Sequence, residues 1–318
     1  MSTQEFLQLL RENTIYRVIT GSTAYGLNVE HSDIDEKAFV ILPPTRAFTL
    51  GKEWETDTFH NPDIEFHSLK KAMNLLNSQN PTILETLFVS QPFVVKQTKH
   101  GKWIRENREL FLSQNCYHSF GGYAKDQLMR IKNGLQKATP NEQLEHLEYK
   151  LNQMVSEMKE RYPALEDGMI QVQHISKDSK GNPQSNLSVQ FNQISLTELN
   201  GITTELTNAQ KSYSKKDRQT KKPTEQLYKH AMHLLRLLMM GTEILKEGRL
   251  TVYQEKQQTF LKGIRNQEYS WDEIFTIAED LFEKLRQAKE QTILPKSTDK
   301  SKINKLYTDI IQNYYGLS

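Results

Sequence analysis

The stretch that decides the fold is IYRVITGSTAYGLNVEHSDIDEKAFVIL, residues 15–42. Its apolar start, residues 15–20, is typical of a buried strand, and this strand ends at Gly21. After a polar connection, residues 34–42 predict a second strand, because their apolar half stops at two consecutive prolines. The sequence therefore places Gly21 at the end of one strand and Asp33-Ile34-Asp35 at the start of the next.

A third strand follows further along the chain. Residues 63–67, DIEFH, alternate between polar and apolar side chains, so that Asp63, Glu65 and His67 share one strand face. An amphipathic helix is predicted directly after it, over residues 68–78. Strands and helices therefore alternate in the first part of the chain.

Beyond about residue 98 the pattern changes to long helices. They are predicted over residues 103–112, 120–136, 141–161, 224–246, 254–263, 271–291 and 302–315. Residues 169–196 interrupt them with two alternating runs joined by a polar loop, which predicts a β-hairpin. We therefore expect an α+β fold: an N-terminal mixed-sheet domain, residues 1–95, followed by a mainly helical domain, residues 96–318, with a β-hairpin insertion.

Length and composition exclude several classes of protein. The 318 residues suffice for two domains, and 36% hydrophobic with 25% charged residues exclude disordered and collagen-like chains. Cys116 is the only cysteine, so an internal disulfide and a thiolate zinc cluster are excluded. No apolar run approaches the ~20 residues that cross a membrane, and the first residues lack the features of a secretory signal. We expect a soluble, cytoplasmic protein with no membrane partner.

The net charge of +2 is too small to indicate nucleic-acid binding by the whole chain. One local stretch is strongly basic, residues 211–222. It contains Lys211, Lys215, Lys216, Arg218, Lys221 and Lys222 against Asp217 alone. Such a stretch is either a solvated loop or a phosphate-binding one.

Gly21 and Ser22 have the chemistry of a phosphate cradle. Glycine lets the backbone approach a ligand closely, and Ser22 adds a hydroxyl and an amide donor at the start of a helix. Together these groups suit an oxygen of a triphosphate.

Three carboxylates form the candidate catalytic and metal-ligating set. Asp33 and Asp35, one residue apart at a strand start, point to the same side, while Ile34 between them is expected in the core. Glu65 lies between apolar neighbours, where a charge is costly without a partner, and a metal would supply that partner. Asp63 lies on the same strand face and is the alternative to Glu65.

Carboxylates bind hard divalent cations, so the expected cofactor is Mg²⁺ or Mn²⁺. Such a set supports phosphoryl-group transfer with two ions about 3.5–4 Å apart. One ion lowers the pKa of the attacking hydroxyl and the other holds the triphosphate. Glu65 is then the candidate general base, unless activation by the metal alone suffices.

These residues resemble a known superfamily. Gly21-Ser22 after an apolar strand, Asp33-x-Asp35 and the later Glu65 resemble the signature of the DNA polymerase beta superfamily. More narrowly, four blocks resemble the RlaP-like nucleotidyltransferases, which are found beside RNA-repair ligases: GSTAYGL (21–27), SDID (32–35), NPTILETLF (80–88) and KHAMHLLRLLMMGTEIL (229–245). The resemblance implies a nucleotidyltransferase catalytic domain over residues 1–95 and a nucleotide- and acceptor-binding helical domain over residues 96–318.

The last of these blocks carries a basic helix face. Lys229, His233 and Arg236 are spaced so that they share one side of the predicted helix. The resemblance implies that this side belongs to the nucleotide site, where Lys229 and Arg236 hold phosphate oxygens. The alternative is that these residues pair with nearby acids.

The resemblance implies transfer of a nucleoside monophosphate from a nucleoside triphosphate to a hydroxyl, with release of pyrophosphate. It also implies RNA, at a 3′ end under repair, as the acceptor. The alternatives are a protein side chain or a small molecule such as an aminoglycoside as acceptor, or an inactive nucleotide- or RNA-binding regulator. The intact set of Asp33, Asp35 and Glu65 argues against the inactive regulator.

Overall fold

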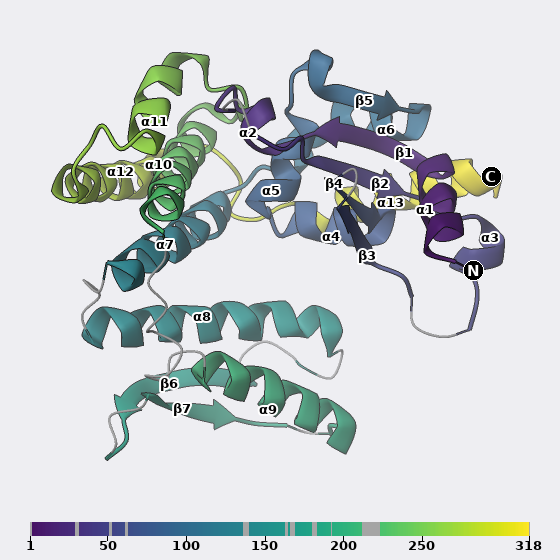
Figure 1. Ribbon diagram of the computed structural model, residues 1–318. Coiled ribbons are helices and arrows are strands. Elements are labelled where there is room, and N and C mark those ends of the chain that lie inside the picture. The colour runs from purple at the N-terminus through teal and green to yellow at the C-terminus, as the bar shows by residue number, and fades with distance from the viewer. Residues whose placement is uncertain are drawn as a thin grey trace. The chain divides into compact units, whose positions relative to one another are not determined.

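The computed structural model describes residues 2–28, 32–50, 53–60, 63–135, 140–162, 165, 169–179, 183–191, 193–211 and 223–317. Over these residues the chain has a mixed α+β fold, with a five-stranded mixed sheet near the N-terminus (Figure 1), which confirms the predicted α+β class and N-terminal mixed sheet. Of the basic stretch 211–222, all but Lys211 lies outside the described residues.

The sheet is built from β1 (Thr14–Ile19), β2 (Glu36–Val40), β3 (Thr56–His60), β4 (Asp63–Ser68) and β5 (Val94–Gln97). The strands lie in the order β3-β4-β2-β1-β5, and β2 and β4 are parallel whereas the other neighbours are antiparallel. Because parallel neighbours begin at the same end, the start of β2 lies beside the start of β4. The polar residues at these two starts therefore lie at the same end of the sheet.

Helices and short 3₁₀ turns complete the architecture. The helices are α1 (Thr3–Glu12), α2 (Gly21–Ala24), α3 (Pro44–Ala47), α4 (Leu69–Asn77), α5 (Pro81–Leu84), α6 (Lys99–Glu106), α7 (Cys116–Gly134), α8 (Pro140–Arg161), α9 (Leu196–Lys211), α10 (Thr224–Glu247), α11 (Gln258–Arg265), α12 (Trp271–Gln291) and α13 (Lys300–Tyr315). The 3₁₀ turns are η1 (Glu85–Leu87), η2 (Gln91–Phe93), η3 (Arg108–Phe111) and η5 (Glu255–Gln257). Ser68 caps α4 by accepting a hydrogen bond from the Lys71 amide at 3.1 Å, which explains why the helix begins directly after β4.

One face of the sheet packs against α1 through a buried cluster that includes Leu10, Ile64 and Phe66. The alternation along β4 therefore leaves Glu65 on the opposite face, as predicted. Ile34 was expected in the core, and this expectation is wrong, because its side chain is 55% exposed. The reason is that β2 begins only at Glu36, so the alternation of a strand does not yet apply to Ile34.

Packing divides the chain into two compact units. The first combines Met1–Ala124 with Ala231–Ser318, and the second is Lys125–His230. The predicted boundary at residue 95 lies inside the first unit, because the C-terminal helix α13 packs against α4 and α6. The division by packing therefore differs from the predicted division into a catalytic and a binding domain.

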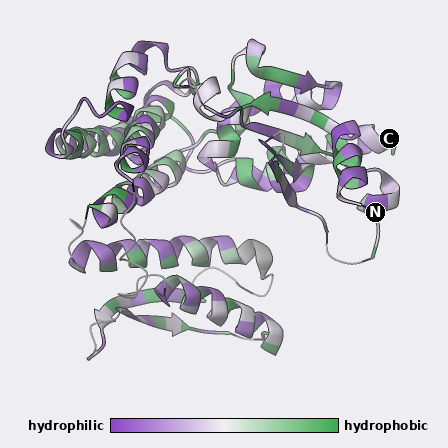
Figure 2. Cartoon of the chain, in the orientation of Figure 1, coloured by the Kyte–Doolittle hydropathy of each residue, from purple (hydrophilic) through white to green (hydrophobic). Residues whose placement is uncertain are grey.

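The second unit contains the predicted β-hairpin. Its strands β6 (Ile170–Lys177) and β7 (Pro183–Val189) pair antiparallel, and they pack with α8 and α9 around a core that includes Leu151, Met158 and Ile202. Figure 2 shows hydrophilic and hydrophobic turns alternating along α8, as expected for a helix with one buried side. Among the helices that the structure describes, none has the length and apolar composition needed to cross a membrane.

Candidate active site

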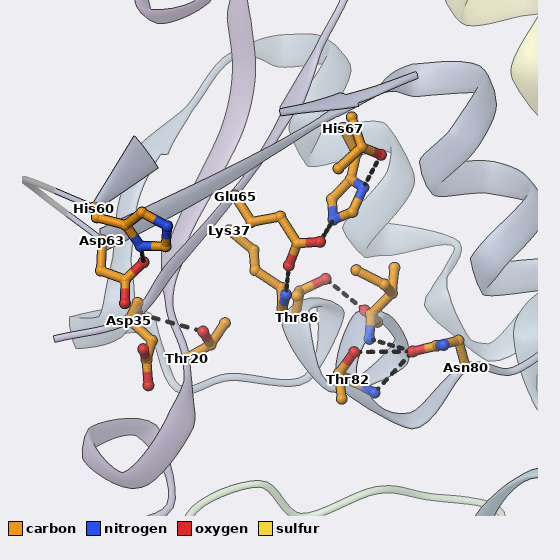
Figure 3. Close-up of polar contacts among 12 residues, drawn as sticks. Thr20, Asp35, Lys37, His60, Asp63, Glu65, His67, Asn80, Thr82 and Thr86 are labelled. Carbon is orange, nitrogen blue, oxygen red and sulfur yellow. Dashed lines mark hydrogen bonds and ion pairs between the residues drawn. The ribbon is translucent and has the colours of Figure 1, made fainter. Parts of the chain in front are cut away.

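The parallel register of β2 and β4 brings two acidic residues level with one another. Glu36 pairs with Ile64, and Lys37 pairs with Glu65. One step back along both strands, Asp35 directly precedes β2 and Asp63 opens β4. Asp35 and Asp63 therefore lie at the same end of the sheet, and Figure 3 shows both at the same side of the site.

The backbone of Asp35 is fixed by β1. Its carbonyl oxygen accepts hydrogen bonds from the Thr20 amide at 2.8 Å and from the Thr20 hydroxyl at 3.3 Å. Asp33, two residues earlier, is exposed. The predicted pair of aspartates thus precedes β2, with Asp35 anchored beside the end of β1.

Gly21 follows Thr20 directly and approaches the Asp35 side chain. Its φ is +65°, in the left-handed region that favours glycine, and a Cβ there would lie 2.3 Å from Asp35 Oδ2. Ser22 follows in the short helix α2, as the sequence predicted for a helix start, and its carbonyl accepts the Leu27 amide at 2.8 Å. The close approach that requires glycine is therefore to the Asp35 carboxylate.

Glu65 lies between two partners on the same strand face. Its carboxylate forms an ion pair with Lys37, and its Oε1 lies 3.4 Å from His67 Nε2 (Figure 3). His67 is buried and also contacts the Thr56 hydroxyl through Nδ1 at 3.0 Å. The contact with His67 and the Lys37 ammonium lower the pKa of Glu65 to about 2, against the opposing effect of burial.

Glu65, the third carboxylate of the predicted set, is therefore already paired with side chains of the protein. Asp63, the alternative, has a weaker partner, since the nearest atoms of the exposed His60 and Asp63 are 3.6 Å apart. Within the described part of the chain, no three acidic or histidine side chains gather closely enough to form a metal site. The aspartates that are level at the sheet end still offer oxygen ligands, the donor type that a hard divalent cation prefers.

Arg236 is buried with a carboxylate and an aromatic ring. Its Nη1 donates to Glu85 Oε1 at 2.7 Å, and its guanidinium carbon lies 3.7 Å from the centre of the Tyr25 ring. The Tyr25 hydroxyl donates a short hydrogen bond to the other oxygen of Glu85. Burial raises the pKa of Tyr25, so its hydroxyl stays protonated as a donor. Arg236 therefore forms an ion pair with a nearby acid, which is the alternative to phosphate binding given by the sequence.

Lys229 and His233 lie on α10 with Arg236. Lys229 is exposed and His233 is half-buried. Their assignment to the nucleotide site stays a prediction. The residues that sequence reasoning missed are Tyr25 and Glu85, as partners of Arg236. The sequence does contain a sign that Glu85 is paired, because a carboxylate inside the apolar run TILETLF needs a partner when that run is buried.

Comparison with known proteins identifies the family of the chain. A family model described as RlaP, RNA repair pathway DNA polymerase beta family, matches residues 2–309. No curated protein and no solved structure matches the chain. Since the family model covers nearly all of the 318 residues, the chain belongs to the RlaP family, a DNA polymerase beta-type nucleotidyltransferase family of RNA repair.

Proposed function

We propose that the protein transfers a nucleoside monophosphate from a nucleoside triphosphate to the 3′ hydroxyl of an RNA, with release of pyrophosphate. The observation that carries this proposal is the juxtaposition at the sheet end: Asp35 and Asp63 are level, and Gly21 lies against Asp35. Acidic oxygens beside a glycine-serine loop have the chemistry to hold a metal-bound triphosphate.

The donor set fits Mg²⁺ or Mn²⁺, because every candidate ligand is a carboxylate oxygen. We propose Asp33 and Asp35 as ligands, completed by a carboxylate of β4. Sequence reasoning selects Glu65 for this role, whereas the strand register favours Asp63 as the acid nearest to Asp35. Two bound ions would lower the pKa of the attacking hydroxyl and neutralise charge on the triphosphate.

The side chains of the protein bind and orient the substrates. Ser22 and the backbone around Gly21 hold triphosphate oxygens, and we propose the basic face of α10 as a further nucleotide contact. In the reaction, the acceptor oxygen forms a bond to the α-phosphorus. The bond from that phosphorus to the bridging oxygen of pyrophosphate breaks, and the hydroxyl proton passes to a carboxylate or to water. The ion pair with Lys37 makes Glu65 a weak base, which favours activation of the hydroxyl without a dedicated base.

RNA is favoured as the acceptor because the family is one of RNA repair. The decisive experiment incubates the protein with each α-labelled nucleoside triphosphate, Mg²⁺ and a pool of small RNAs, then separates the products by size and class. We expect label to enter RNA and to be lost in Asp35→Ala. Asp280→Ala is the matched control, because Asp280 pairs with Lys284 on an exposed surface of α12.

Three results would count against parts of this proposal. Label in protein or in an added aminoglycoside, with none in RNA, would replace the acceptor. Near wild-type turnover by folded Asp35→Ala would overturn the proposed site. Absence of any transfer with any triphosphate, while nucleotide still binds, would favour a regulator.

A further inference from the structure

The loop that leaves the candidate site makes a sharp turn at Gly26. This residue has a φ of +71°, and a Cβ on it would lie 2.7 Å from the Tyr253 ring and 3.1 Å from Gln258 Nε2. Only glycine satisfies both the left-handed backbone and this close packing. The turn therefore fits the surface of the segment that includes α11.

Three successive carbonyls of this turn accept hydrogen bonds from that segment. The Tyr25 carbonyl accepts from the Gln254 amide at 3.0 Å, and the Gly26 carbonyl accepts a short bond from the Gln258 side-chain amide. The Leu27 carbonyl accepts from Arg265 Nη1 at 3.0 Å. Gln258 and Arg265 are the first and last residues of α11, so both ends of this helix hold the turn.

The side chain of Tyr25 is held separately. Its hydroxyl bonds to Glu85 and its ring lies beneath Arg236, and all three side chains are buried. The backbone of the turn is thus bonded mainly to α11, while the Tyr25 side chain contacts η1 and α10. Figure 1 shows α2 beside α10 and α11, consistent with these bonds.

Hydrogen bonds within the loop connect the residues that make these contacts to Gly21 and Ser22. The Tyr25 amide donates to the Gly21 carbonyl at 3.2 Å, and the Leu27 amide donates to the Ser22 carbonyl at 2.8 Å. A loop closed on itself in this way moves as a unit, so fixing Tyr25 to Leu27 also fixes the residues that face Asp35. Without α11, the loop would have to be ordered when nucleotide binds, at the expense of affinity.

We infer that Gln258 and Arg265 are positioning residues for the nucleotide: they hold residues 21–27 in the conformation that receives the triphosphate. This role rests on the proposed function and adds to it residues that the sequence places far from any motif. Loss of either side-chain hydrogen bond is expected to weaken nucleotide binding up to about tenfold, the range of one net hydrogen bond, with kcat little changed.

The test compares Gln258→Ala and Arg265→Met with matched variants. Gln257→Ala is the control for Gln258→Ala, because Gln257 is exposed and its side chain makes no capping bond to α11. Arg265→Lys is the rescue variant, because a lysine can still donate to the single Leu27 carbonyl. Thermal unfolding of each variant checks that the fold persists.

Two measurements are made on each protein. The first is the Kd for α,β-methylene ATP with Mg²⁺, together with KM and kcat for the transfer. The second is hydrogen exchange of the amides of residues 22–27 without nucleotide. We expect Gln258→Ala and Arg265→Met to raise Kd and KM and to speed exchange in the loop. Gln257→Ala should match the wild type, and Arg265→Lys should recover most of the affinity.

Unchanged exchange and unchanged Kd in both variants would overturn the inference. Faster exchange with unchanged Kd would also overturn it, because the contacts would then be structural only. A wild-type protein that binds no nucleotide would overturn the proposed function instead, and the binding measurement on the wild type distinguishes this failure from the others.

Discussion

Lys37 and Glu65 form an ion pair across the parallel strands β2 and β4, at the point where the sequence predicted the third metal ligand. An ammonium beside a carboxylate competes with a metal ion for it, since both are cations. Asp63 is level with Asp35, and its ion-pair partner among the described residues is the imidazole of His60, 3.6 Å away. The choice between the two acids of β4 as the metal ligand therefore leads to different predictions.

If Asp63 completes the metal site, Asp63→Asn should lower kcat by about a hundredfold or more, and Glu65→Gln by about tenfold or less. Turnover should be measured together with Mn²⁺ binding by electron paramagnetic resonance, which does not depend on activity. The reverse order in both measurements would restore Glu65 as the ligand.

Gly21→Ala should impair both stability and turnover. The left-handed backbone alone is expected to destabilise the protein by about 1–2 kcal/mol, and the new Cβ must also displace the Asp35 carboxylate. Gly248→Ala is the matched control, because its φ is +63° but the nearest atom to a new Cβ is 3.7 Å away. Urea unfolding and steady-state kinetics should show a similar backbone cost in both and lost turnover only in Gly21→Ala. Equal activity of the two variants would mean that the contact with Asp35 has no function.

Arg236→Met tests the two interpretations of the basic helix face. Removing the guanidinium leaves the buried Glu85 carboxylate unpaired, so we expect a loss of about 3–5 kcal/mol in the free energy of unfolding. Adding Glu85→Gln should recover part of that loss, because a neutral amide still accepts from Tyr25. A stable Arg236→Met protein with a raised KM for nucleotide would instead support the phosphate-binding role.

Lowering the pH should reduce the free energy of unfolding through protonation of Glu65. Its pKa is lowered from 4.5 to about 2 in the folded chain, so the unfolded state takes up the proton first as the pH falls. The stabilisation is fully present above about pH 4.5 and is lost as the pH falls towards 2. Urea unfolding across this range should show a smaller pH dependence for Glu65→Gln than for the wild type. Identical slopes would show that the ion pair adds no net stability.

The basic stretch 211–222 has its own prediction, which comes from sequence alone. Neutralising Lys215, Lys216, Lys221 and Lys222 should weaken RNA binding and flatten its salt dependence, since each phosphate contact contributes about −0.7 to the log–log slope. Nucleotide affinity should not change. An unaltered salt slope would identify the stretch as a solvated loop and would favour an acceptor other than RNA.

Local sequence was sufficient to predict β1, β2, β4, the β6–β7 hairpin and the long helices α7, α8, α10 and α12, whereas β3, β5 and α9 were not predicted. The apolar alternation of residues 63–67 and the capping Ser68 lie within a few residues of the structure they determine, and β4 and α4 follow as predicted. The hairpin of β6 and β7 was predicted for the same reason, because alternation and a polar loop are local signals.

The partners in the site could not be predicted in the same way. Lys37 meets Glu65 only because of the register between two strands, and a register is set by tertiary packing. Glu85 and Arg236 are 151 positions apart, so no spacing in the sequence reveals their pairing. The exposure of Ile34 was missed because a shift of two residues in the start of β2 decides it.

The order in which the chain is made gives the split first unit a further consequence. Ala231–Ser318 leaves the ribosome after the whole of Lys125–His230, yet it supplies Arg236 for Glu85 and Arg265 for Leu27. Until this last segment is synthesised, the Glu85 carboxylate, which is buried in the folded chain, lacks the Arg236 guanidinium as a partner and stays exposed to water. During synthesis, the intervening unit can therefore fold before the first unit is complete, and a nascent chain that stops short of α11 carries residues 21–27 without the helix whose two ends bond to them.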